Sequence, residues 1–223
     1  MIDFFNRRRV LMSLLLVLLV WLGGFALWSV EMTDAPLDEP ISLSPAGHVE
    51  RTIRVRMDGP HELSFKFSIG SRPRKEAMVL VGKFSPFGKD GLRTRPSGTD
   101  VPIRWSLSDP SGRRVASGEG STFGGDSHAE KEIWRMIAQP KGLIPGPYRF
   151  EASILRDCPE FHGLTAHLQL ALPGRKISFG WRSDLLFWGS AANYYLIGPF
   201  ALSLAFVLIG LELGRWLALR GNR

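Results

Sequence analysis

"LIPGPYRFEASI", residues 143–154, decides the fold of the central part of this chain. A Pro-Gly turn opens it, and from Tyr148 to Ile154 every second residue is apolar. Such alternation is typical of a half-buried β-strand. A tyrosine at the start of a late strand in a β-sandwich often bonds its hydroxyl to the backbone at a corner, so we expect Tyr148 to hold a structural corner.

The same alternation recurs along the chain on both sides of this strand. "HVERTIRVRM" and "HELSFKFSI", separated by the turn sequence "DGP", predict a hairpin over residues 49–69, with Arg51 as a charged exception on its apolar face. No convincing amphipathic helix interrupts the series, which predicts an all-β, immunoglobulin-like antiparallel β-sandwich over residues 46–173. The further strands expected are Ala77–Lys83, Val101–Ser108, Arg113–Gly118, Glu130–Ala138, Tyr148–Leu155 and Leu164–Leu172.

Two uncharged apolar stretches flank the predicted sandwich. Residues 10–30 carry no charge, and as a helix they would span about 30 Å, the thickness of a bilayer core. A second uncharged stretch covers residues 185–211, and we place a transmembrane helix at 190–214 with Tyr194 and Tyr195 at its outer interface. The sequence therefore predicts two transmembrane helices, and we expect the first to be an uncleaved anchor, with a cleaved signal peptide as the alternative.

Two features of the second helix carry structural expectations. Gly198-Pro199 predicts a kink, since proline has no N–H to donate and membrane helices tolerate this where the freed carbonyl finds a partner. Glu212 and Arg215 lie three residues apart, which places them on one helix face, and we expect them to form an ion pair.

The basic residues determine the expected orientation in the membrane. Three arginines precede the first helix and three follow the second, and positive charge is retained on the cytoplasmic side. We therefore expect a two-pass bacterial inner-membrane protein with both termini cytoplasmic and the sandwich periplasmic. The expected segments are a basic tail 1–9, a helix 10–30, an acidic linker 31–45, the sandwich 46–173, a juxtamembrane connector 174–189, a helix 190–214 and a basic tail 215–223.

The formal net charge of +7 does not indicate a nucleic-acid-binding surface. The tails and helices hold six arginines with Asp3 and Glu212, which leaves 22 basic and 19 acidic residues in the middle of the chain. These charges are interspersed in sign, as on an ordinary solvated surface. The expected partners are the lipid bilayer and an envelope or periplasmic protein, and no nucleic acid.

"LIPGPYRFEASILRDCPEFHGLTAHLQL", with the upstream "DVPIRWSLSDPSGRRV", resembles an uncharacterised proteobacterial family of periplasmic domains. In that family a "PG-x-Y" strand is followed by an acidic-proline segment with "PE" and then by a last strand. The resemblance covers residues 47–172 and not the helices. It implies an immunoglobulin-like β-sandwich in the periplasm, and it supplies no catalytic residues.

Two segments are candidates for contact with a partner. Residues 83–100 show no pattern and are long for a loop in a compact domain, and such loops are often binding elements. "SGEGSTFGGDSHAE", residues 117–130, lacks the strand–loop–helix context of a nucleotide-binding loop, so we expect a hairpin or edge loop, with partner binding as the alternative. The residues of the candidate partner-binding loop are Phe84, Phe87, Arg93 and Arg95.

Cys158 is the chain's single cysteine and its one candidate nucleophile. A reactive thiol needs a lowered pKa and a base or cation beside it. Arg156 and His162 are near in sequence, but Asp157 and Glu160 oppose the thiolate. We expect a buried thiol at a strand end. An intermolecular disulfide and a reactive thiol remain as alternatives.

The spacing of His162 and His167 does not favour a metal site, because residues five apart on a strand point to opposite faces. A zinc ion would need further ligands from Asp157, Cys158 and a distant histidine. We expect scattered surface histidines, with no metal and no cofactor.

The sequence thus predicts a membrane-anchored periplasmic protein-binding module without catalytic activity. An immunity-type protein that neutralises an incoming toxin is one version, and a scaffold within an envelope complex is another. The alternative is an envelope enzyme or redox protein that uses Cys158 with His162.

Overall fold

The chain divides into a helical unit and a β unit. The computed structural model describes residues 2–70, 72–82, 97–122, 127–128, 131–173 and 180–221. The helical unit combines residues 1–32 with 178–223, and the β unit comprises residues 33–177. The β unit is therefore inserted, in sequence, between the helices of the other unit.

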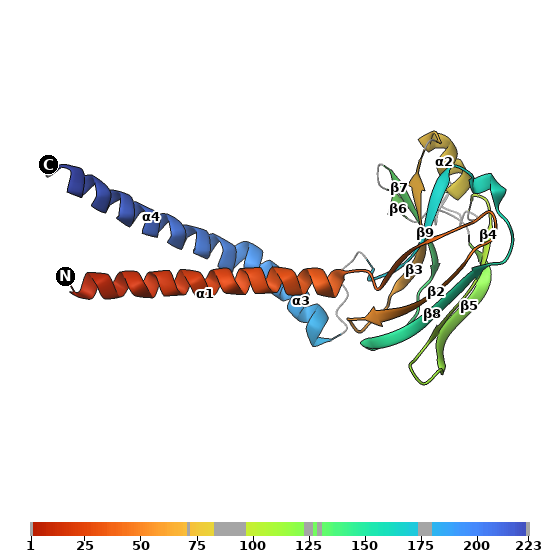
Figure 1. Ribbon diagram of the computed structural model, residues 1–223, viewed down its shortest axis with the longest axis horizontal. Coiled ribbons are helices and arrows are strands. Elements are labelled where there is room, and N and C mark those ends of the chain that lie inside the picture. The colour runs from red at the N-terminus through yellow and green to blue at the C-terminus, as the bar shows by residue number, and fades with distance from the viewer. Residues whose placement is uncertain are drawn as a thin grey trace, which may run out of the picture. The chain divides into compact units, whose positions relative to one another are not determined.

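Two antiparallel sheets make up the β unit (Figure 1). One has the strand order β1-β9-β3-β7-β6 and the other has the order β2-β8-β4-β5. The strands are β1 Leu37–Ile41, β2 His48–Val55, β3 Glu62–Ile69, β4 Val101–Ser108, β5 Arg114–Thr122, β6 Ser127–His128, β7 Glu132–Ala138, β8 Gly146–Ile154 and β9 Leu164–Ala171. The all-antiparallel arrangement agrees with the short alternating strands of the sequence.

The inner faces of both sheets share one hydrophobic core. In β4, the odd-numbered residues from Val101 to Leu107 are buried and the residues between them are not. β3 contributes Phe65 and Phe67 from the five-stranded sheet, and β8 contributes Phe150 from the other, each fully buried. Burying one such side chain contributes about 1.5–3 kcal/mol, so this core is the main source of stability of the β unit.

The hairpin predicted over residues 49–69 is wrong. β2 pairs with β8, whereas β3 pairs with β7 and β9 in the other sheet. The "DGP" turn therefore carries the chain across the core from one sheet to the other. Both strands have one apolar face because both face the same core, and alternation alone does not distinguish these arrangements. Arg51 lies at the edge between the sheets, where its Nε bonds Oε1 of Glu39 on β1 at 2.9 Å.

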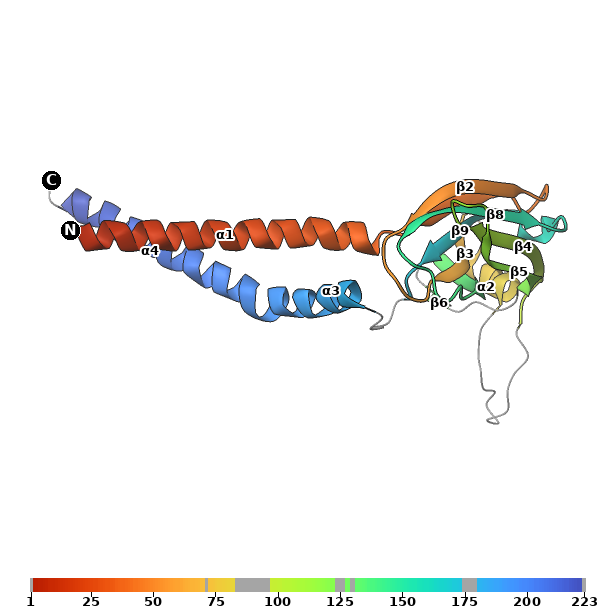
Figure 2. The same cartoon turned by 90° about the horizontal axis from the view of Figure 1, so that it is seen from below.

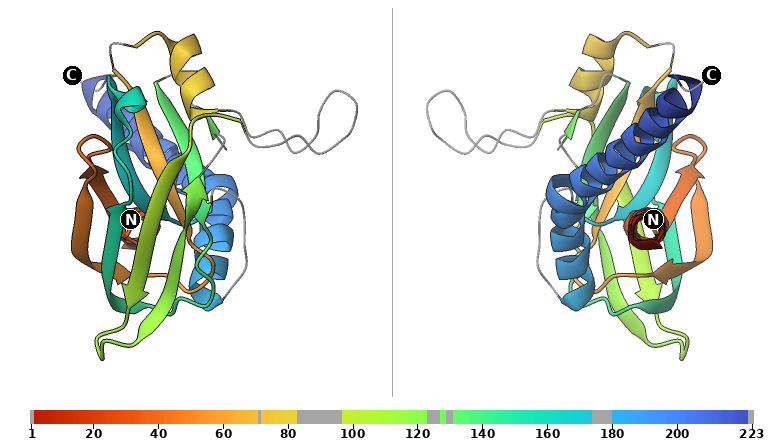
Figure 3. Two further views of the ribbon diagram at one scale, coloured as in Figure 1. Left: turned by 90° about the vertical axis from the view of Figure 1, so that its right-hand side faces the viewer. Right: turned by 90° about the vertical axis from the view of Figure 1, so that its left-hand side faces the viewer.

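The strand predicted at Ala77–Lys83 is also wrong, because most of this segment lies in a helix, α2, Arg74–Val81. Pro73 precedes its first turn, and Ala77 and Val81, four residues apart, are both buried. The helix lies at one end of the sheets, beside β7 (Figure 3). A short apolar run such as "AMVLV" fits a buried strand and a buried helical turn equally well, which explains the error.

The expected linker 31–45 contains the strand β1. α1, Ile2–Thr33, ends three residues before β1 begins, and β1 pairs with β9 along its whole length. Leu37 at the start of β1 lies opposite Leu170 near the end of β9. The two connections to the helical unit therefore leave the β unit from neighbouring strands, at the same end of one ladder.

A polar network on the outer face of the five-stranded sheet fixes β1 in place. Asp38 Oδ1 pairs with Nδ1 of His167 at 2.8 Å, and Oδ2 accepts hydrogen bonds from Lys66 and, at 3.3 Å, from Gln169. Trp134 Nε1 donates to Oε1 of Gln169 at 3.1 Å. Partial burial raises the pKa of Asp38, but the bonds from Lys66 and His167 outweigh this effect and hold the pKa below its usual 3.8.

Asp38→Asn is expected to destabilise the β unit by about 1 kcal/mol at neutral pH, since it removes charge-assisted bonds to β3 and β9. The folded-state pKa of Asp38 lies below the unfolded value, so its contribution is present above about pH 4 and is lost as the pH falls through the folded pKa. Thermal unfolding of the full chain in detergent at about pH 7 and about pH 2 measures this difference. An equal destabilisation at both pH values would contradict the assignment.

In the helical unit, α1 lies antiparallel to the C-terminal helices. α3, Trp181–Ala192, continues through a π-helical stretch, Asn193–Ile197, into α4, Gly198–Gly221. Three contacts join α1 to these C-terminal helices. Residue numbers increase along α1 as they decrease along the C-terminal helices, as in any antiparallel pair. The contacts are Arg8 Nη2 to Glu212 Oε1 at 2.5 Å, Trp21 Nε1 to Asn193 Oδ1 at 2.9 Å, and the ring of Phe25 against Gly189. Glu212 thus pairs across the helices with Arg8, and the expected pairing with Arg215 is wrong.

The helical axis bends between α3 and α4, close to the predicted kink (Figure 2). The N–H of Gly198 bonds the carbonyl of Asn193, five residues earlier, instead of the usual four. This wider turn precedes Pro199, which cannot donate a backbone hydrogen bond. The π-helical stretch therefore accommodates the proline without ending the helix.

Two helical segments, Arg8–Thr33 and Trp181–Leu217, are long and apolar enough to cross a membrane, judged by length and composition. The second contains 37 residues, more than the roughly 20 that a bilayer core requires. It includes the part of the expected connector 174–189 that begins at Trp181, so that part is helical.

Candidate functional site

The candidate partner-binding residues Phe84, Phe87, Arg93 and Arg95 lie outside the described residues. The chain before and after that segment is described, and its two sides meet. The N–H of Thr99 donates to the carbonyl of Leu80 at 2.7 Å. We call residues 80–82 and 97–99 the loop stem.

Two glycines allow the sides of the loop stem to come into backbone contact. Gly82 and Gly98 have φ values of +89° and +105°, which favour glycine. A Cβ on Gly82 would lie 1.8 Å from the carbonyl oxygen of Ser97, and one on Gly98 would lie 2.5 Å from that of Val81. A side chain at either position would force the two backbones apart.

Arg135 on β7 is fully buried and binds the loop stem. Its Nη1 donates to the carbonyls of Thr99 at 2.9 Å and Thr122 at 3.2 Å. Its Nη2 donates to the carbonyl of Val81 and, at 3.4 Å, to that of Leu80. Leu80 and Val81 end α2, where the helix dipole favours a cation. One side chain therefore joins both sides of the stem to the end of β5.

Aromatic rings and burial define the electrostatics of Arg135. Its Cζ lies 5.5 Å and 5.6 Å from the ring centroids of Phe67 and Phe161, within the range of cation–π attraction. Burial lowers the pKa of Arg135 to about 10, and the nearby Asp100 partly offsets this effect. The guanidinium is charged at neutral pH, and its Nε has no acceptor among the described residues. The interior of the β unit thus holds a charged group that is hydrogen-bonded to backbone carbonyls and lies near the charge of Asp100.

The sequence reasoning missed Arg135, although a signal was present. Ile133, Arg135 and Ile137 share one parity in β7, and Ile133 is buried. A charged residue at an inward-facing position of a strand requires internal partners, because a buried charge without them is very unfavourable. That parity identifies Arg135 as buried, but its carbonyl partners lie 13 to 55 residues away in sequence.

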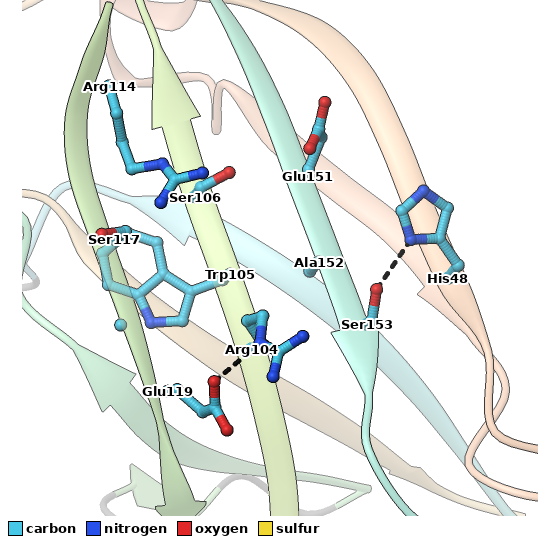
Figure 4. Close-up of a pocket in the computed structure, with 11 residues that line it drawn as sticks. His48, Arg104, Trp105, Ser106, Arg114, Ser117, Glu119, Glu151, Ala152 and Ser153 are labelled. Carbon is cyan, nitrogen blue, oxygen red and sulfur yellow. Dashed lines mark hydrogen bonds and ion pairs between the residues drawn. The ribbon is translucent and has the colours of Figure 1, made fainter.

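A shallow polar depression of about 320 Å³ lies on the outer face of the four-stranded sheet (Figure 4). Its ion pairs are exposed, as on a solvated surface, where each contributes little. His48 Nδ1 and Ser153 Oγ lie 2.9 Å apart, and Arg114 has no ion pair among the described residues. The ion pairs on this face are Arg104–Glu119 at 2.6 Å, Arg149–Glu50 at 2.8 Å and Arg149–Glu151 at 2.9 Å.

Cys158 is buried and precedes a 3₁₀ turn, Pro159–Phe161. Its Sγ lies 3.3 Å from the carbonyl oxygen of Arg156, and no hydrogen bond between described residues joins it to the ring of His162. Burial raises the pKa of the Cys158 thiol; the Arg156 charge opposes this shift and the Glu160 charge reinforces it. The thiol is therefore protonated at neutral pH, and this geometry does not support the thiolate that the enzyme alternative requires.

Iodoacetamide is expected to alkylate Cys158 in the native full chain at least about 100-fold more slowly than in the unfolded chain, because the thiol is buried and protonated. Mass spectrometry over time measures the two rates. Ser117→Cys combined with Cys158→Ala places a single thiol at an exposed position and serves as the control. Native Cys158 reacting as fast as that control would contradict the buried thiol.

The histidines are dispersed over the β unit. His167 bonds Asp38 on the outer face of the five-stranded sheet, whereas His48 bonds Ser153 on the other sheet. Asp157 accepts a backbone N–H bond at 2.6 Å. Within the described part of the chain, no group of three potential metal ligands forms.

Tyr148 holds the corner before β8. Its hydroxyl donates to the carbonyl of Ile144 at 2.9 Å and lies 3.3 Å from the N–H of the same residue. The ring is buried in the core, so one side chain fixes the turn and packs inward. This contact is structural and remote from the loop stem in sequence.

Comparisons with known proteins inform the fold alone. No family model and no curated protein matches the chain. A crystal structure of a protein from Sulfurospirillum deleyianum is similar, with 19% sequence identity and a TM-score of 0.51. The match covers 64% of this chain and 99% of that protein. The length of the match is close to that of the β unit, and a sequence identity of 19% is too low to support an inference about function.

Proposed function

We propose that this chain is a two-pass inner-membrane protein whose β unit binds another envelope protein in the periplasm. Side-chain contacts between α1 and the antiparallel C-terminal helices support the two-pass anchor, since Arg8 pairs with Glu212 near the two termini. A second contact, from Trp21 to Asn193, lies about 20 Å further along α1, so side chains bridge the helices at two points separated by most of a bilayer thickness. The basic tails favour a cytoplasmic location for both ends.

The proposed fold of the β unit is an immunoglobulin-like β-sandwich with two strands exchanged. The pairings β3–β7, β8–β4 and β4–β5 match strands B–E, F–C and C–C′ of an immunoglobulin domain. In that fold the first strand joins B and the last joins F. Here the last strand, β9, pairs with β3, and β2 pairs with β8. The exchange brings β9 next to β1, so both chain connections leave from one ladder.

The loop stem is the observation that carries the binding proposal. Arg135, Gly82 and Gly98 hold the two ends of residues 83–96 together by backbone bonds and close contact. Binding loops are commonly presented by a rigid scaffold, and the aromatic and arginine content of this segment suits a protein interface. The work proposed is non-enzymatic, either as an immunity-type protein or as a scaffold of an envelope complex.

The experiment is affinity purification of the full chain after mild detergent extraction. A stoichiometric protein partner is expected, and the double variant Phe84→Ala, Phe87→Ala should reduce its capture at least about tenfold, as loss of interface anchors does. Ile144→Ala, an exposed apolar residue elsewhere on the β unit, is the matched control and should retain capture. No stoichiometric partner, or equal capture by all three proteins, would contradict the proposal.

A further inference from the structure

The two lateral edges of the β unit differ. At one edge, β1 and β2 are joined by the Arg51–Glu39 ion pair, and Pro40 removes a backbone donor from β1. At the other edge, β4 is the only strand that pairs with β5 within the described part of the chain. Between Val115 and Ser121, the backbone groups of β5 that point away from β4 have no partner among the described residues. An unprotected edge of this kind is a template for another strand.

A groove runs along the inner side of β5. Residues Ala116, Gly118 and Gly120 lie opposite the bulky residues Leu107, Trp105 and Ile103 of β4. Their small size leaves a space of about 500 Å³, bounded on the far side by residues 137–141. A Cβ on Gly120 would meet no atom within 4 Å, so the groove is open at that point. Glycines inside a strand often mark a place where another backbone approaches closely.

Trp105 forms part of the groove and has an unused donor. Its indole N–H has no hydrogen-bond acceptor among the described residues, and it is not one of the enclosed polar atoms that lack a partner. A Cβ on Gly118 would lie 2.8 Å from Trp105 Nε1, so the glycine lets the indole lie against the strand. An inserted backbone carbonyl would supply the acceptor.

The charges at the groove favour an acidic ligand. Glu119 is already paired with Arg104 at 2.6 Å. Lys141 on the wall opposite β5 has no ion pair among the described residues. Its unpaired positive charge complements a carboxylate at one end of the groove.

We propose that an extended segment of the partner protein adds to β5 as a further strand. Main-chain hydrogen bonds to β5 would hold it, small apolar side chains at alternate positions would fill the groove, and an acidic residue would lie near Lys141. This inference rests on the proposed function and names a second contact of the same module, formed by residues 103–122 and 137–141.

The test uses full-length protein in lipid nanodiscs and a displayed library of random eight-residue segments. Selected segments should alternate small apolar with polar residues, carry Asp or Glu at one end, and protect the amides of β5 from hydrogen exchange. Gly120→Val places a side chain in the open groove without a clash and should weaken their binding at least about tenfold. Thr52→Val, at an exposed position of β2 outside the groove, should change it less than about twofold.

The outcomes separate this inference from the proposed function. If no segment is enriched, or if selected segments bind Gly120→Val as well as wild type, strand addition at β5 is wrong. If Gly120→Val retains the co-purified partner while the Phe84→Ala, Phe87→Ala variant loses it, the inference fails and the proposed function stands. A wild-type dimer that Gly120→Val converts to a monomer would show that the occupant is a second copy, which contradicts the inference as stated. Equal melting temperatures of Gly120→Val and wild type confirm that the variant is folded.

Discussion

Arg135→Met is expected to lower the free energy of unfolding of the β unit by about 3–5 kcal/mol, because it leaves several buried carbonyls without a donor. Methionine fills much of the same volume, but it cannot bond the buried carbonyls of Val81 and Thr122 or the partly buried carbonyl of Thr99. Replacing both members of a buried ion pair by apolar residues can be neutral. This compensation is not available for Arg135, because its hydrogen-bond partners are backbone carbonyls, which no side-chain substitution removes.

Thermal unfolding of the full chain in detergent, followed by near-ultraviolet circular dichroism, measures the effect as a fall in Tm of roughly 10 °C. Arg104→Met is the matched control, since Arg104 forms an exposed ion pair with Glu119 and the loss of such a pair should change Tm little. The Tm of Arg135→Lys should lie between those of Arg135→Met and Arg104→Met, because a compact ammonium cannot span carbonyls on both sides of the stem. Equal stability of Arg135→Met and Arg104→Met would show that the stem does not depend on the buried guanidinium.

Gly82→Ala is expected to destabilise the β unit by about 3 kcal/mol or more and to reduce partner capture. Its Cβ would lie 1.8 Å from the carbonyl oxygen of Ser97, and the positive φ of +89° adds strain. The two sides of the stem would have to separate, so the Thr99–Leu80 backbone bond would weaken. Amide hydrogen exchange at Thr99 measures this separation directly, and unfolding curves measure its cost.

Gly142→Ala separates the steric effect from the backbone strain. Gly142 also has a positive φ, +72°, but a Cβ there would meet no atom within 4 Å. Its substitution should therefore cost only about 1 kcal/mol, the strain of a left-handed alanine. If Gly82→Ala costs no more than Gly142→Ala and leaves Thr99 protected, the close contact at the stem is not essential to the fold.

Alternation of side chains predicted most strands of the β unit, because both sheets bury one face. Alternation of side chains does not determine which strands pair with each other. β2 and β3 are consecutive and both amphipathic, yet they lie in different sheets instead of pairing. Helix α2 was missed because its eight residues are too few to show a helical period.

The candidate site was predictable only in part. The Tyr148 corner depends on residues four apart, and local sequence predicts such a contact. The loop stem depends on hydrogen bonds from Arg135 to carbonyls of α2, of the segment before β4 and of β5. Every residue has a backbone carbonyl, so the sequence does not indicate which carbonyls Arg135 binds. The groove beside β5 forms where three small residues lie opposite large residues of β4. Predicting it requires the pairing register of the two strands, which the sequence alone does not specify.

The exported position of the β unit is the claim on which the functional account depends, and paired reporter fusions test it most directly. Alkaline phosphatase, active only in the periplasm, is fused after Gly174 in one protein and at the C-terminus in another. The account predicts high activity after Gly174 and none at the C-terminus. In the sequence, the β unit lies between two proposed transmembrane helices, so its export places both chain ends in the cytoplasm. A silent fusion after Gly174 with an active one at the C-terminus would contradict it.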